Sequence, residues 1–399
     1  MSRAGARLRR VVVLCVATSW LHAALAQDPA AGADPFVVGI GRSINDPEAS
    51  ADALARLGVR SLRLDAPWKS IESAPGRYYV PAWLDAAVDA ARAHDIEPLL
   101  ILAYGHPLYG DDKPRTPAAI AAFGRYAMFV TRHFEGRVRY FDLWNEWDAG
   151  TGRTTPGNPE DYVELARNVY PAVKSATPGV VVLSGGIASL GIKNDWMERF
   201  IAAGGLKLID GLSLHPYNFQ QRDSTTPEAA IAELDRLHGL AAAAGRPLPI
   251  YVTEMGYPTF DGRGGVSRDV AALYLARFLL LASTRPYVAG TWWYCLRDQG
   301  NDPANKEHNF GVLDSKLRSK PAGDALRAVA TLIRDVRRFR DESTSGDAAA
   351  GETRVSGTRA DGSTIVLAWN AAGTDTQLLR DLAAATTTDA RPVSNSRRR

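Results

Sequence analysis

Two glutamates each stand at the end of a short apolar segment of the kind that forms a buried strand. Glu146 follows the segment 138–144, with Asn145 between them, and Glu254 closes the segment 249–254. Hydrolysis of a glycosidic bond needs two facing carboxyl groups, because one protonates the leaving oxygen while the other attacks the anomeric carbon or activates water. The sequence therefore predicts glycoside hydrolysis, provided that the fold brings these two side chains together.

Residues at the ends of other apolar segments fit the same chemistry. Aromatic rings offer flat faces to sugar rings, and Asn, His, Tyr and Arg side chains hydrogen-bond to hydroxyl groups. The candidates for substrate binding are Arg63, Trp68, His106, Asn145, His215, Tyr217, Trp292 and Trp293. Because side chains alternate along a strand, only one of the two neighbouring tryptophans is expected to face inward.

Each candidate also has a purely structural interpretation. A lone glutamate can stabilise a helix start or an ion pair, an arginine can brace the fold, and histidines and tryptophans are often core residues. The pairing of Glu146 and Glu254, with Asn145 beside the first, favours catalysis. No metal site is predicted, because the sequence has neither a His-Glu-x-x-His motif nor a cluster of Cys and His. No cofactor is expected.

The elements that must position these residues follow one repeating pattern from residue 36 to about 340. The expected strands are 36–41, 59–65, 96–103, 138–144, 180–184, 210–215, 249–254 and 288–294. Amphipathic segments near 47–57, 81–94, 116–134, 158–176, 194–204, 227–244, 267–284 and 320–339 are the expected helices. Eight such units favour a (β/α)8 barrel, or TIM barrel, whose catalytic side chains lie at the carboxyl ends of the strands.

A doubly wound open sheet is the alternative fold. It would usually carry a glycine-rich phosphate turn after the first strand. Here Gly39-Ile40-Gly41 is followed by Arg42 and Ser43, with no third glycine in place. The barrel is therefore the preferred interpretation.

The composition changes after residue 340. Residues 341–351 are small and polar, and 353–359 and 363–370 alternate like two strands around the turn Asp361-Gly362. A third strand is expected at 377–382. We therefore expect a small β appendage over 341–383 and a disordered tail over 384–399.

The first 26 residues have the pattern of a secretory signal peptide. The basic start contains Arg3, Arg7, Arg9 and Arg10. An apolar run over 11–25 follows and ends in Ala24-Leu25-Ala26. The run is short for a membrane span, which favours a cleaved signal peptide, and an uncleaved anchor is the alternative. Residues 27–35 are expected to be a linker, and the protein is expected to be exported to the periplasm or secreted.

Cleavage would change what the net charge implies. The whole chain carries 47 basic and 44 acidic side chains, a net charge of +3. Without residues 1–26 it loses four arginines and no acid, which leaves 43 against 44. A nearly neutral chain disfavours nucleic acid and suits a glycan partner. Cys295 would be the one remaining cysteine, so no intramolecular disulfide is expected.

Three segments together resemble a known clan of enzymes. Leu143-Trp144-Asn145-Glu146-Trp147 resembles the strand-four motif of clan A glycoside hydrolases. Val252-Thr253-Glu254-Met255-Gly256-Tyr257 resembles their strand-seven nucleophile motif, and 58–65 with Trp68 is similar to their strand two. Family 39, which includes bacterial enzymes that process exopolysaccharides, is the most similar family, and the resemblance covers about 36–340.

The resemblance implies a retaining mechanism with Glu146 as acid/base and Glu254 as nucleophile. It also implies that Asn145 holds the substrate 2-hydroxyl, that Tyr217 and Arg63 orient Glu254, and that His215 lies beside them. Trp292 or Trp293 would form a sugar platform. The apolar tryptophans next to Glu146 and the second carboxylate are expected to raise the pKa of Glu146.

These observations predict an exported retaining glycosidase that cleaves a β-linked extracellular polysaccharide, with internal cleavage preferred. The alternatives are an exo-acting β-xylosidase-like enzyme, a catalytically inactive glycan-binding barrel associated with polysaccharide export, and a membrane-anchored biosynthetic partner. An inactive barrel would be expected to have lost part of the catalytic set, whereas this sequence keeps both glutamates and Asn145. The oligomeric state is left open.

Overall fold

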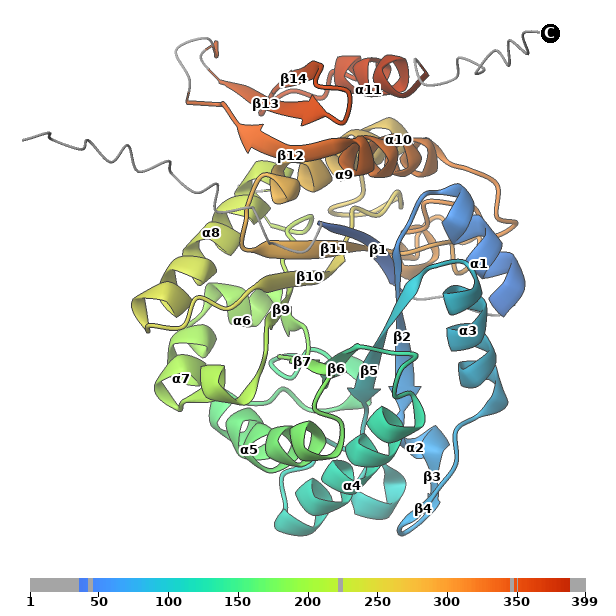
Figure 1. The fold of residues 1–399 in the computed structure, drawn as a ribbon, viewed down its shortest axis with the longest axis vertical. Coiled ribbons are helices and arrows are strands. Elements are labelled where there is room, and N and C mark those ends of the chain that lie inside the picture. Colours follow the sequence, from blue (N-terminus) through green and yellow to red (C-terminus); the bar gives the residue numbers. More distant parts are fainter. Residues whose placement is uncertain (1–35, 42–45, 222–224, 345–347, 350, 388–399) are drawn as a thin grey trace, which may run out of the picture. The chain divides into compact units, whose positions relative to one another are not determined.

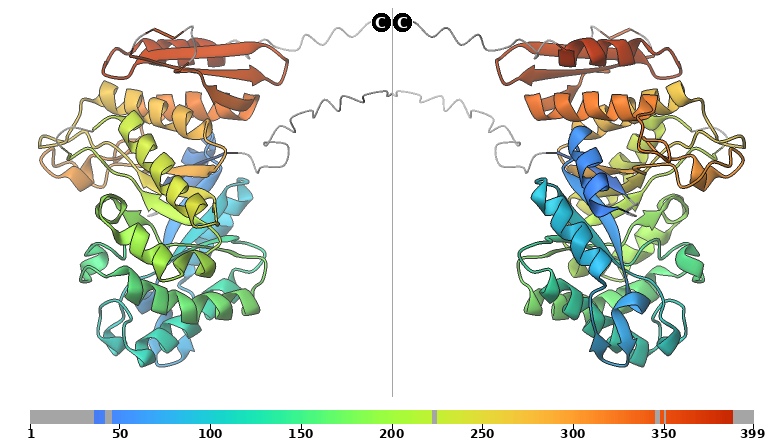
Figure 2. Two further views of the ribbon diagram at one scale, coloured as in Figure 1. Left: turned by 90° about the vertical axis from the view of Figure 1, so that its left-hand side faces the viewer. Right: turned by 90° about the vertical axis from the view of Figure 1, so that its right-hand side faces the viewer.

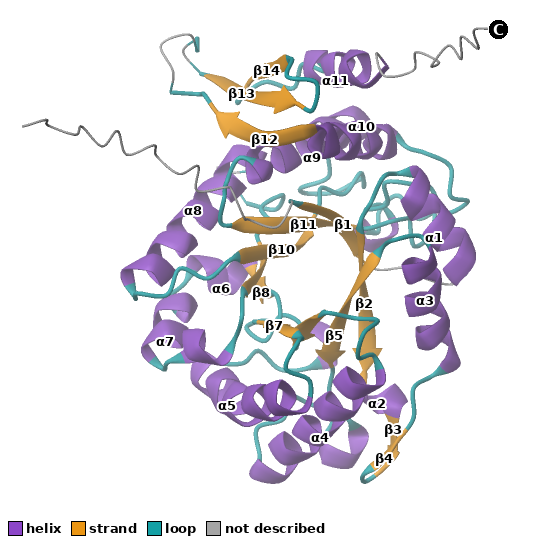
Figure 3. Cartoon of the chain, in the orientation of Figure 1, coloured by secondary structure: helices purple, strands orange, loops and turns teal. Residues whose placement is uncertain are grey.

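The computed structural model of the chain describes residues 36–41, 46–221, 225–344, 348–349 and 351–387. Within these residues a barrel of parallel strands is surrounded by helices (Figures 1 and 3). The predicted signal peptide 1–26 and the predicted linker 27–35 lie outside the described residues. Among the described helices, none has both the length and the apolar character needed to cross a bilayer.

The barrel strands confirm the predicted fold class. They are β1 (Val37–Gly41), β2 (Ser61–Pro67), β5 (Glu97–Ala103), β6 (Tyr140–Leu143), β7 (Val181–Leu183), β8 (Ile187–Ala188), β9 (Leu212–His215), β10 (Ile250–Met255) and β11 (Val288–Tyr294). Their order is β7-β6-β5-β2-β1-β11-β10-β9-β8, and neighbouring strands pair in parallel. Each of the eight predicted strands is present, so the chain forms a (β/α)8 barrel.

The fifth barrel strand is divided in two. β7 pairs with β6, β8 pairs with β9, and a bridge between Leu183 and Gly211 closes the ring. Gly185 and Gly186 make the break, with φ values of 74° and 58°. A Cβ on Gly185 would collide with the Leu143 carbonyl, and one on Gly186 would collide with the ring of His215. Only glycine fits this break.

The helices that cover the barrel are α1 (Pro47–Arg56), α3 (Ala82–Ala93), α4 (Pro117–His133), α5 (Pro159–Ala176), α7 (Trp196–Ala202), α8 (Pro227–Ala243), α9 (Arg268–Ser283) and α10 (Pro321–Asp335). Thr116, Asn158 and Thr226 cap α4, α5 and α8, each accepting a hydrogen bond from the third helical amide and preceding a proline. These caps agree with the starts that the sequence predicts.

Short elements fill the connections between the main ones. They are α2 (Trp68–Ile71), β3 (Glu72–Ala74), β4 (Arg77–Tyr78) and α6 (Ser189–Lys193), with 3-10 turns at Pro107–Tyr109, Thr151–Arg153, Gly205–Leu208 and Lys306–His308. The turn at Thr151–Arg153 belongs to the loop that carries Glu146. This turn places Thr151, whose hydroxyl donates to the Glu146 carboxylate.

Large side chains fill the amino-terminal half of the barrel interior. Leu99, Leu183 and Trp292 form a buried cluster, against which the strand-start residues Val37 and Tyr140 pack. The Trp292 ring lies in the space that a side chain on Gly39 would occupy, and its Nε1 donates to Ser61 Oγ at 2.9 Å. Because this half of the barrel interior is filled, the open space inside the barrel lies toward the carboxyl ends of the strands.

The carboxyl-terminal appendage corrects three sequence predictions. Residues 336–341 are strand β12 (Val336–Asp341), not the end of a helix over 320–339, and β12 pairs with β13 (Glu352–Arg359), which pairs with β14 (Thr364–Asn370). Residues 377–382 belong to a helix, α11 (Gln377–Thr387), instead of a strand. Residues 384–387 of the predicted disordered tail continue this helix, and 388–399 lie outside the described residues.

Spacing explains the first two errors. Val336 and Phe339 are three apart, as on a helix face, but an irregular register between them lets both be buried in a strand. Leu378 and Leu382 are four apart, and both are buried. That spacing is the helical one, and it outweighed the apparent alternation.

The appendage packs on α9 and α10 (Figures 1 and 2). Arg277 of α9 is fully buried, pairs with Glu228 of α8, and donates to the carbonyl of Gly373 at 3.0 Å. Trp369 Nε1 of β14 donates to the same Glu228 at 2.7 Å. α9 is therefore covered on several sides, which explains why residues 271–282 are all buried.

Candidate active site

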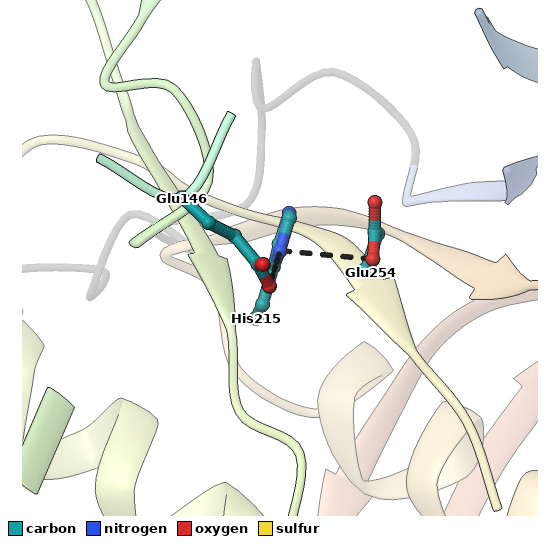
Figure 4. A group of neighbouring side chains, drawn as sticks. All are labelled: Glu146, His215 and Glu254. Carbon is teal, nitrogen blue, oxygen red and sulfur yellow. Dashed lines mark hydrogen bonds and ion pairs between the residues drawn. The ribbon is translucent and has the colours of Figure 1, made fainter. Parts of the chain in front are cut away.

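The two glutamates lie on either side of one histidine (Figure 4). Glu146 stands in the loop after β6, Glu254 near the end of β10, and His215 at the end of β9. His215 Nδ1 is 2.9 Å from Glu146 Oε1 and 3.7 Å from Glu254 Oε2. One carboxylate oxygen of each glutamate and a histidine nitrogen all lie within 4.8 Å of one another. The carboxyl groups thus face each other at the open end of the barrel.

Side-chain donors hold Glu254. Arg63 Nη1 donates to its Oε1 at 2.6 Å, and the Tyr217 hydroxyl donates to its Oε2 at 3.1 Å. Burial raises the pKa of Tyr217 well above its usual value, and the charge of Glu254 adds to this. Tyr217 therefore keeps its proton and remains a donor. Both partners suit an ionised carboxylate, which can only accept hydrogen bonds.

Arg63 of β2 links Glu254 to two other groups. The buried guanidinium donates to Asp142 Oδ2 at 2.8 Å and to Asn145 Oδ1 at 2.8 Å. Burial works against its charge, but Asp142 and Glu254 outweigh burial and raise the pKa of Arg63 above its usual value. Asn145 Nδ2 in turn donates to the Tyr104 hydroxyl at 3.1 Å. The side chain of Asn145 is thereby fixed at the wall of the site.

Backbone and side-chain hydrogen bonds both hold Glu146. Its φ is 51°, and its amide donates to the carbonyls of Gly185 at 2.9 Å and Gly186 at 3.0 Å. The Thr151 hydroxyl donates to Oε2, and His215 contacts Oε1. A non-glycine residue at positive φ is uncommon and persists only where its surroundings fix it.

The pKa of Glu146 lies below its usual value, so the expectation of a raised pKa is wrong. Burial raises it, but the hydrogen bonds from His215 and Thr151 and the charge of Arg63 lower it. Trp144 and Trp147 are buried and pack edge to face, with ring centroids 5.4 Å apart.

A cavity of about 880 Å³ opens over the two glutamates. Its aromatic lining consists of Trp83, Tyr104, Tyr217, Phe219, Tyr294 and Phe310. Its polar lining includes Asp65, Asn145, Ser189, Gln220, Gln221, Gln299, Lys306 and Glu307. Trp83, in the first turn of α3, is 45% exposed, which is unusual for so large an apolar side chain. This mixture of rings and hydrogen-bonding groups suits a carbohydrate.

Several solved structures have a similar fold, and they include glycoside hydrolases. A family 39 glycoside hydrolase from Bacteroides cellulosilyticus WH2 matches with a TM-score of 0.71 and 24% identity, over 84% of this chain and 70% of that one. A monomeric β-xylosidase from Caulobacter crescentus CB15 matches with a TM-score of 0.60 and 17% identity, over 82% and 74%. The fold is that of the clan A glycoside hydrolases. The resemblance seen in the sequence motifs is thereby confirmed at the level of the fold.

A second family of the clan fits the same barrel. Xylanase 10B from Thermotoga maritima matches with a TM-score of 0.55 and 18% identity, over 75% of this chain and 96% of that one. No protein-family model matches the sequence, and the search of curated proteins found no match.

In this barrel, six of the ten predicted site residues come together. Glu146, Glu254, Asn145, Arg63 and Tyr217 line the cavity, and His215 lies beneath the two glutamates. The other four, Trp68, His106, Trp292 and Trp293, are buried and do not line the cavity. Their positions do not fit the predicted contact with substrate.

Trp68 and His106 are structural. Trp68 is fully buried, donates to Glu72 Oε2 at 2.6 Å, and stacks on Tyr109 with ring centroids 4.9 Å apart. His106 Nε2 lies 2.8 Å from the carbonyl of Glu72, and its Nδ1 accepts from the Leu108 amide at 3.1 Å. Both therefore fasten the segment around β3 to the barrel. Tyr104, two residues before His106, reaches the cavity instead.

The two tryptophans of β11 miss the cavity for different reasons. Trp292 does face inward, but it lies one layer too deep, in the cluster that fills the barrel. Trp293 faces outward, against Tyr257 and Phe278. Tyr294 is two residues beyond Trp292 and on the same face, so it is the residue that lines the cavity.

The sequence prediction also missed several residues that shape the site. Thr151 and Tyr104 contact Glu146 and Asn145, and Gly185-Gly186 accept the amide of Glu146. The glycine pair directly after a predicted strand was a usable signal, since such a pair marks a special backbone conformation. Thr151 gave no such signal, because nothing in a loop sequence says where a hydroxyl will point.

Glu146, His215 and Glu254 are also residue types that bind metal ions. Arg63, however, places a positive charge 2.6 Å from Glu254, which opposes a cation at that oxygen. The donor set thus fits acid–base chemistry better than metal binding. That the protein works without a metal or a cofactor stays a prediction.

Proposed function

We propose that the chain is an exported retaining glycoside hydrolase that cleaves a β-linked polysaccharide by double displacement. Glu254 is the nucleophile and Glu146 the acid/base. The observation that carries this proposal is the approach of the two carboxylates, whose oxygens come within 4.8 Å. Retaining enzymes hold their carboxyl groups about 5–5.5 Å apart, whereas inverting enzymes need about 6.5–9.5 Å to admit a water.

The contacts of each glutamate support this division of roles. In the first step Glu254 attacks the anomeric carbon, and Glu146 gives its proton to the leaving oxygen. In the second step Glu146 takes a proton from water, which attacks the anomeric carbon and releases Glu254. Arg63 and Tyr217 keep Glu254 ready to attack. His215 and Thr151 stabilise the ionised Glu146 that the second step needs.

Internal cleavage of a polymer is supported by the cavity. Its volume of about 880 Å³ lies near the top of the range for small-molecule sites, about 300–1,000 Å³. The exposed Trp83 extends an apolar face on its wall, where a further sugar ring of a chain can stack. Export rests on the predicted signal peptide, residues 1–26.

An exo-acting, β-xylosidase-like enzyme is the second candidate, because the β-xylosidase from Caulobacter crescentus shares the fold. The two candidates differ in their products. Internal cleavage yields a ladder of oligosaccharides, whereas exo-action releases single sugars from one chain end. A Trp83→Ala variant should lose activity on polymers much more than on short aryl glycosides if the substrate chain lies along Trp83.

The test is a screen of purified protein against β-linked polysaccharides and aryl glycosides, together with Glu254→Gln and Glu146→Gln. Glu307→Gln is a matched control, because it removes a carboxylate from the rim of the same cavity. We expect the control to stay within about tenfold of wild type and the first product to keep the β configuration. Near-normal turnover in Glu254→Gln, or an inverted first product, would overturn the proposal.

A further inference from the structure

A chain of buried hydrogen bonds leads to His215 from the side opposite the cavity. The Gly186 amide donates to Ser213 Oγ at 2.9 Å, and Ser213 Oγ lies 2.6 Å from Thr253 Oγ1. Thr253 Oγ1 lies 3.0 Å from His215 Nε2. Ser213, Thr253 and His215 each have no exposed surface. The chain joins β8, β9 and β10 beneath the two glutamates.

The direction of this chain follows from counting hydrogens. Each hydroxyl has one hydrogen to donate, and the Gly186 amide can only donate. If Ser213 donates to Thr253, and Thr253 to His215 Nε2, then every hydrogen in the chain has an acceptor. The imidazole must then carry its proton on Nδ1, which points toward the Oε1 of Glu146 at 2.9 Å.

The opposite direction leaves a hydrogen without a partner. If His215 Nε2 donates to Thr253, and Thr253 to Ser213, then the Ser213 hydrogen has no acceptor among the described residues. If Ser213 and His215 both donate to Thr253, then the Thr253 hydrogen has no acceptor among the described residues. A buried donor without an acceptor is costly, so the first arrangement is the stable one.

We infer that Ser213 and Thr253 are positioning residues that hold the His215 proton on Nδ1, where Glu146 accepts its hydrogen bond and Glu254 is the second carboxylate nearby. The inference deepens the proposed function and rests on it for the roles of the glutamates. Nδ1 lies 2.9 Å from Glu146 and 3.7 Å from Glu254. Ionised Glu146 accepts a hydrogen bond from the Nδ1–H of His215. When Glu146 is protonated on its other oxygen, Oε1 can still accept from Nδ1, and ionised Glu254 remains 3.7 Å away.

Gly186 supports the arrangement twice. Its amide starts the chain, and its missing side chain leaves room for the imidazole, because a Cβ there would collide with His215. The other tautomer would turn the Nδ1 lone pair toward two carboxylates and repel their ionised forms. The titratable groups that face His215 are Glu146, Glu254 and Tyr217, with Arg63 on the far side of Glu254.

The first test reads the tautomer directly. In protein with nitrogen-15 histidine, ring nitrogen shifts at neutral pH separate the Nδ1–H tautomer, the Nε2–H tautomer and the imidazolium. The chain has seven histidines, and a His215→Gln variant identifies the signal of interest. We expect a neutral ring with its proton on Nδ1. An Nε2–H ring or an imidazolium in the wild type would overturn the inference, whatever the enzyme turns out to cleave.

The second test breaks the chain with Thr253→Val, which keeps the shape and removes the hydroxyl. We expect His215 to lose its single tautomer and the kcat/KM for the cleaved glycan to fall about tenfold. The alkaline limb of the pH profile should move upward, because Glu146 loses its donor and its pKa rises. Thr253→Ser should restore both readouts. If Thr253→Val does not fold, Thr253→Ala removes the same hydroxyl and should show the same change of tautomer.

Thr291→Val is the matched control. Thr291 is equally buried in β11, next to β10, but its hydroxyl has no hydrogen-bond partner among the described residues. The control should leave the tautomer and the pH profile unchanged. Equal effects of Thr253→Val and Thr291→Val would overturn the inference. If the tautomer result holds but no glycan is cleaved, then the proposed function fails and the hydrogen-bond chain stands.

Discussion

The two glutamates are held in opposite ways. Glu254 lies within strand β10, one residue before its end, and the side chains of Arg63 and Tyr217 fix its carboxylate. Glu146 lies beyond the end of its strand at a positive φ, and the backbone carbonyls of Gly185 and Gly186 fix its main chain. A permanent positive charge lies against one carboxylate, and neutral donors lie against the other.

A second layer of contacts holds the loop that carries Glu146. Lys113 Nζ donates to Ala149 O at 3.0 Å, to Thr154 Oγ1 at 2.6 Å and to Thr155 O at 2.5 Å. Asp148 accepts the amides of Ala188 and Gly191 across the loop's other side, at 2.9 Å and 2.8 Å. The loop therefore has to be clamped from outside, whereas a strand end is held by its own sheet.

The difference fits the two chemical roles. A nucleophile has to stay ionised, so a fixed guanidinium charge suits it. An acid/base has to gain and lose a proton in each cycle, so a permanent countercharge would trap it in one state. Neutral donors on a clamped loop place the carboxyl while leaving its proton exchangeable.

Replacing each glutamate in turn gives the largest expected effect. Glu254→Gln should lower kcat at least about 10⁴-fold on every substrate, because the nucleophile is lost. Glu146→Gln should cost about 10²–10⁴-fold on natural glycans, but far less on aryl glycosides whose phenolate leaves without a proton. Turnover of both variants on a series of leaving groups checks this. Equal dependence on the leaving group would contradict the assigned roles.

Removing the fixed charge should affect both stability and turnover. Arg63→Met leaves the buried Asp142 without its ion pair, which we expect to cost about 3–5 kcal/mol of unfolding free energy. Denaturant unfolding measures this loss, and kcat/KM should fall with it. The double variant Arg63→Met with Asp142→Asn should recover much of the stability without recovering turnover. Recovery of turnover would show that Arg63 acts only as a brace.

Removing the hydrogen bonds of Lys113 should affect only the loop that carries Glu146. Burial lowers the pKa of Lys113 to about 8, which shows that its positive charge is unfavourable there. The fold should therefore tolerate Lys113→Met, which removes this buried charge. The loop 149–155 loses three hydrogen bonds, and kcat/KM should fall about tenfold. Amide hydrogen exchange should speed up over this loop and stay unchanged over β10. Unchanged exchange in the loop would contradict the clamp.

The smallest expected effect is a shift in pH dependence. Thr151 donates to ionised Glu146 and lowers its pKa, so Thr151→Val should raise that pKa. Because the first step needs protonated Glu146, the loss of kcat/KM with rising pH should then begin at a higher pH. Ser189→Ala, which removes another hydroxyl from the cavity wall, should leave the profile in place. A downward shift in Thr151→Val would reverse our interpretation of the Glu146 pKa.

Several parts of the fold and site could be predicted from the sequence for a clear reason. Period-two and helical patterns show which segments are strands and helices, and eight alternations close a barrel. Parallel strands bring their carboxyl ends to one face, so Glu146 and Glu254 had to meet there. The same rule placed Arg63, Asn145 and Tyr217 at the cavity.

Only the tertiary structure shows how deep a side chain lies in the barrel, which groups it contacts and how its pKa is shifted. Alternation shows that Trp292 faces inward, but only the packed barrel shows that Trp292 lies in its core while Tyr294 reaches the cavity. The same limit applies to Trp68 and His106. The pKa of Glu146 depends on His215 and Thr151, whose distances arise from the break at Gly185-Gly186 and from a clamped loop. Periodicity fixes the face of a side chain, whereas its neighbours are fixed only when distant segments pack together.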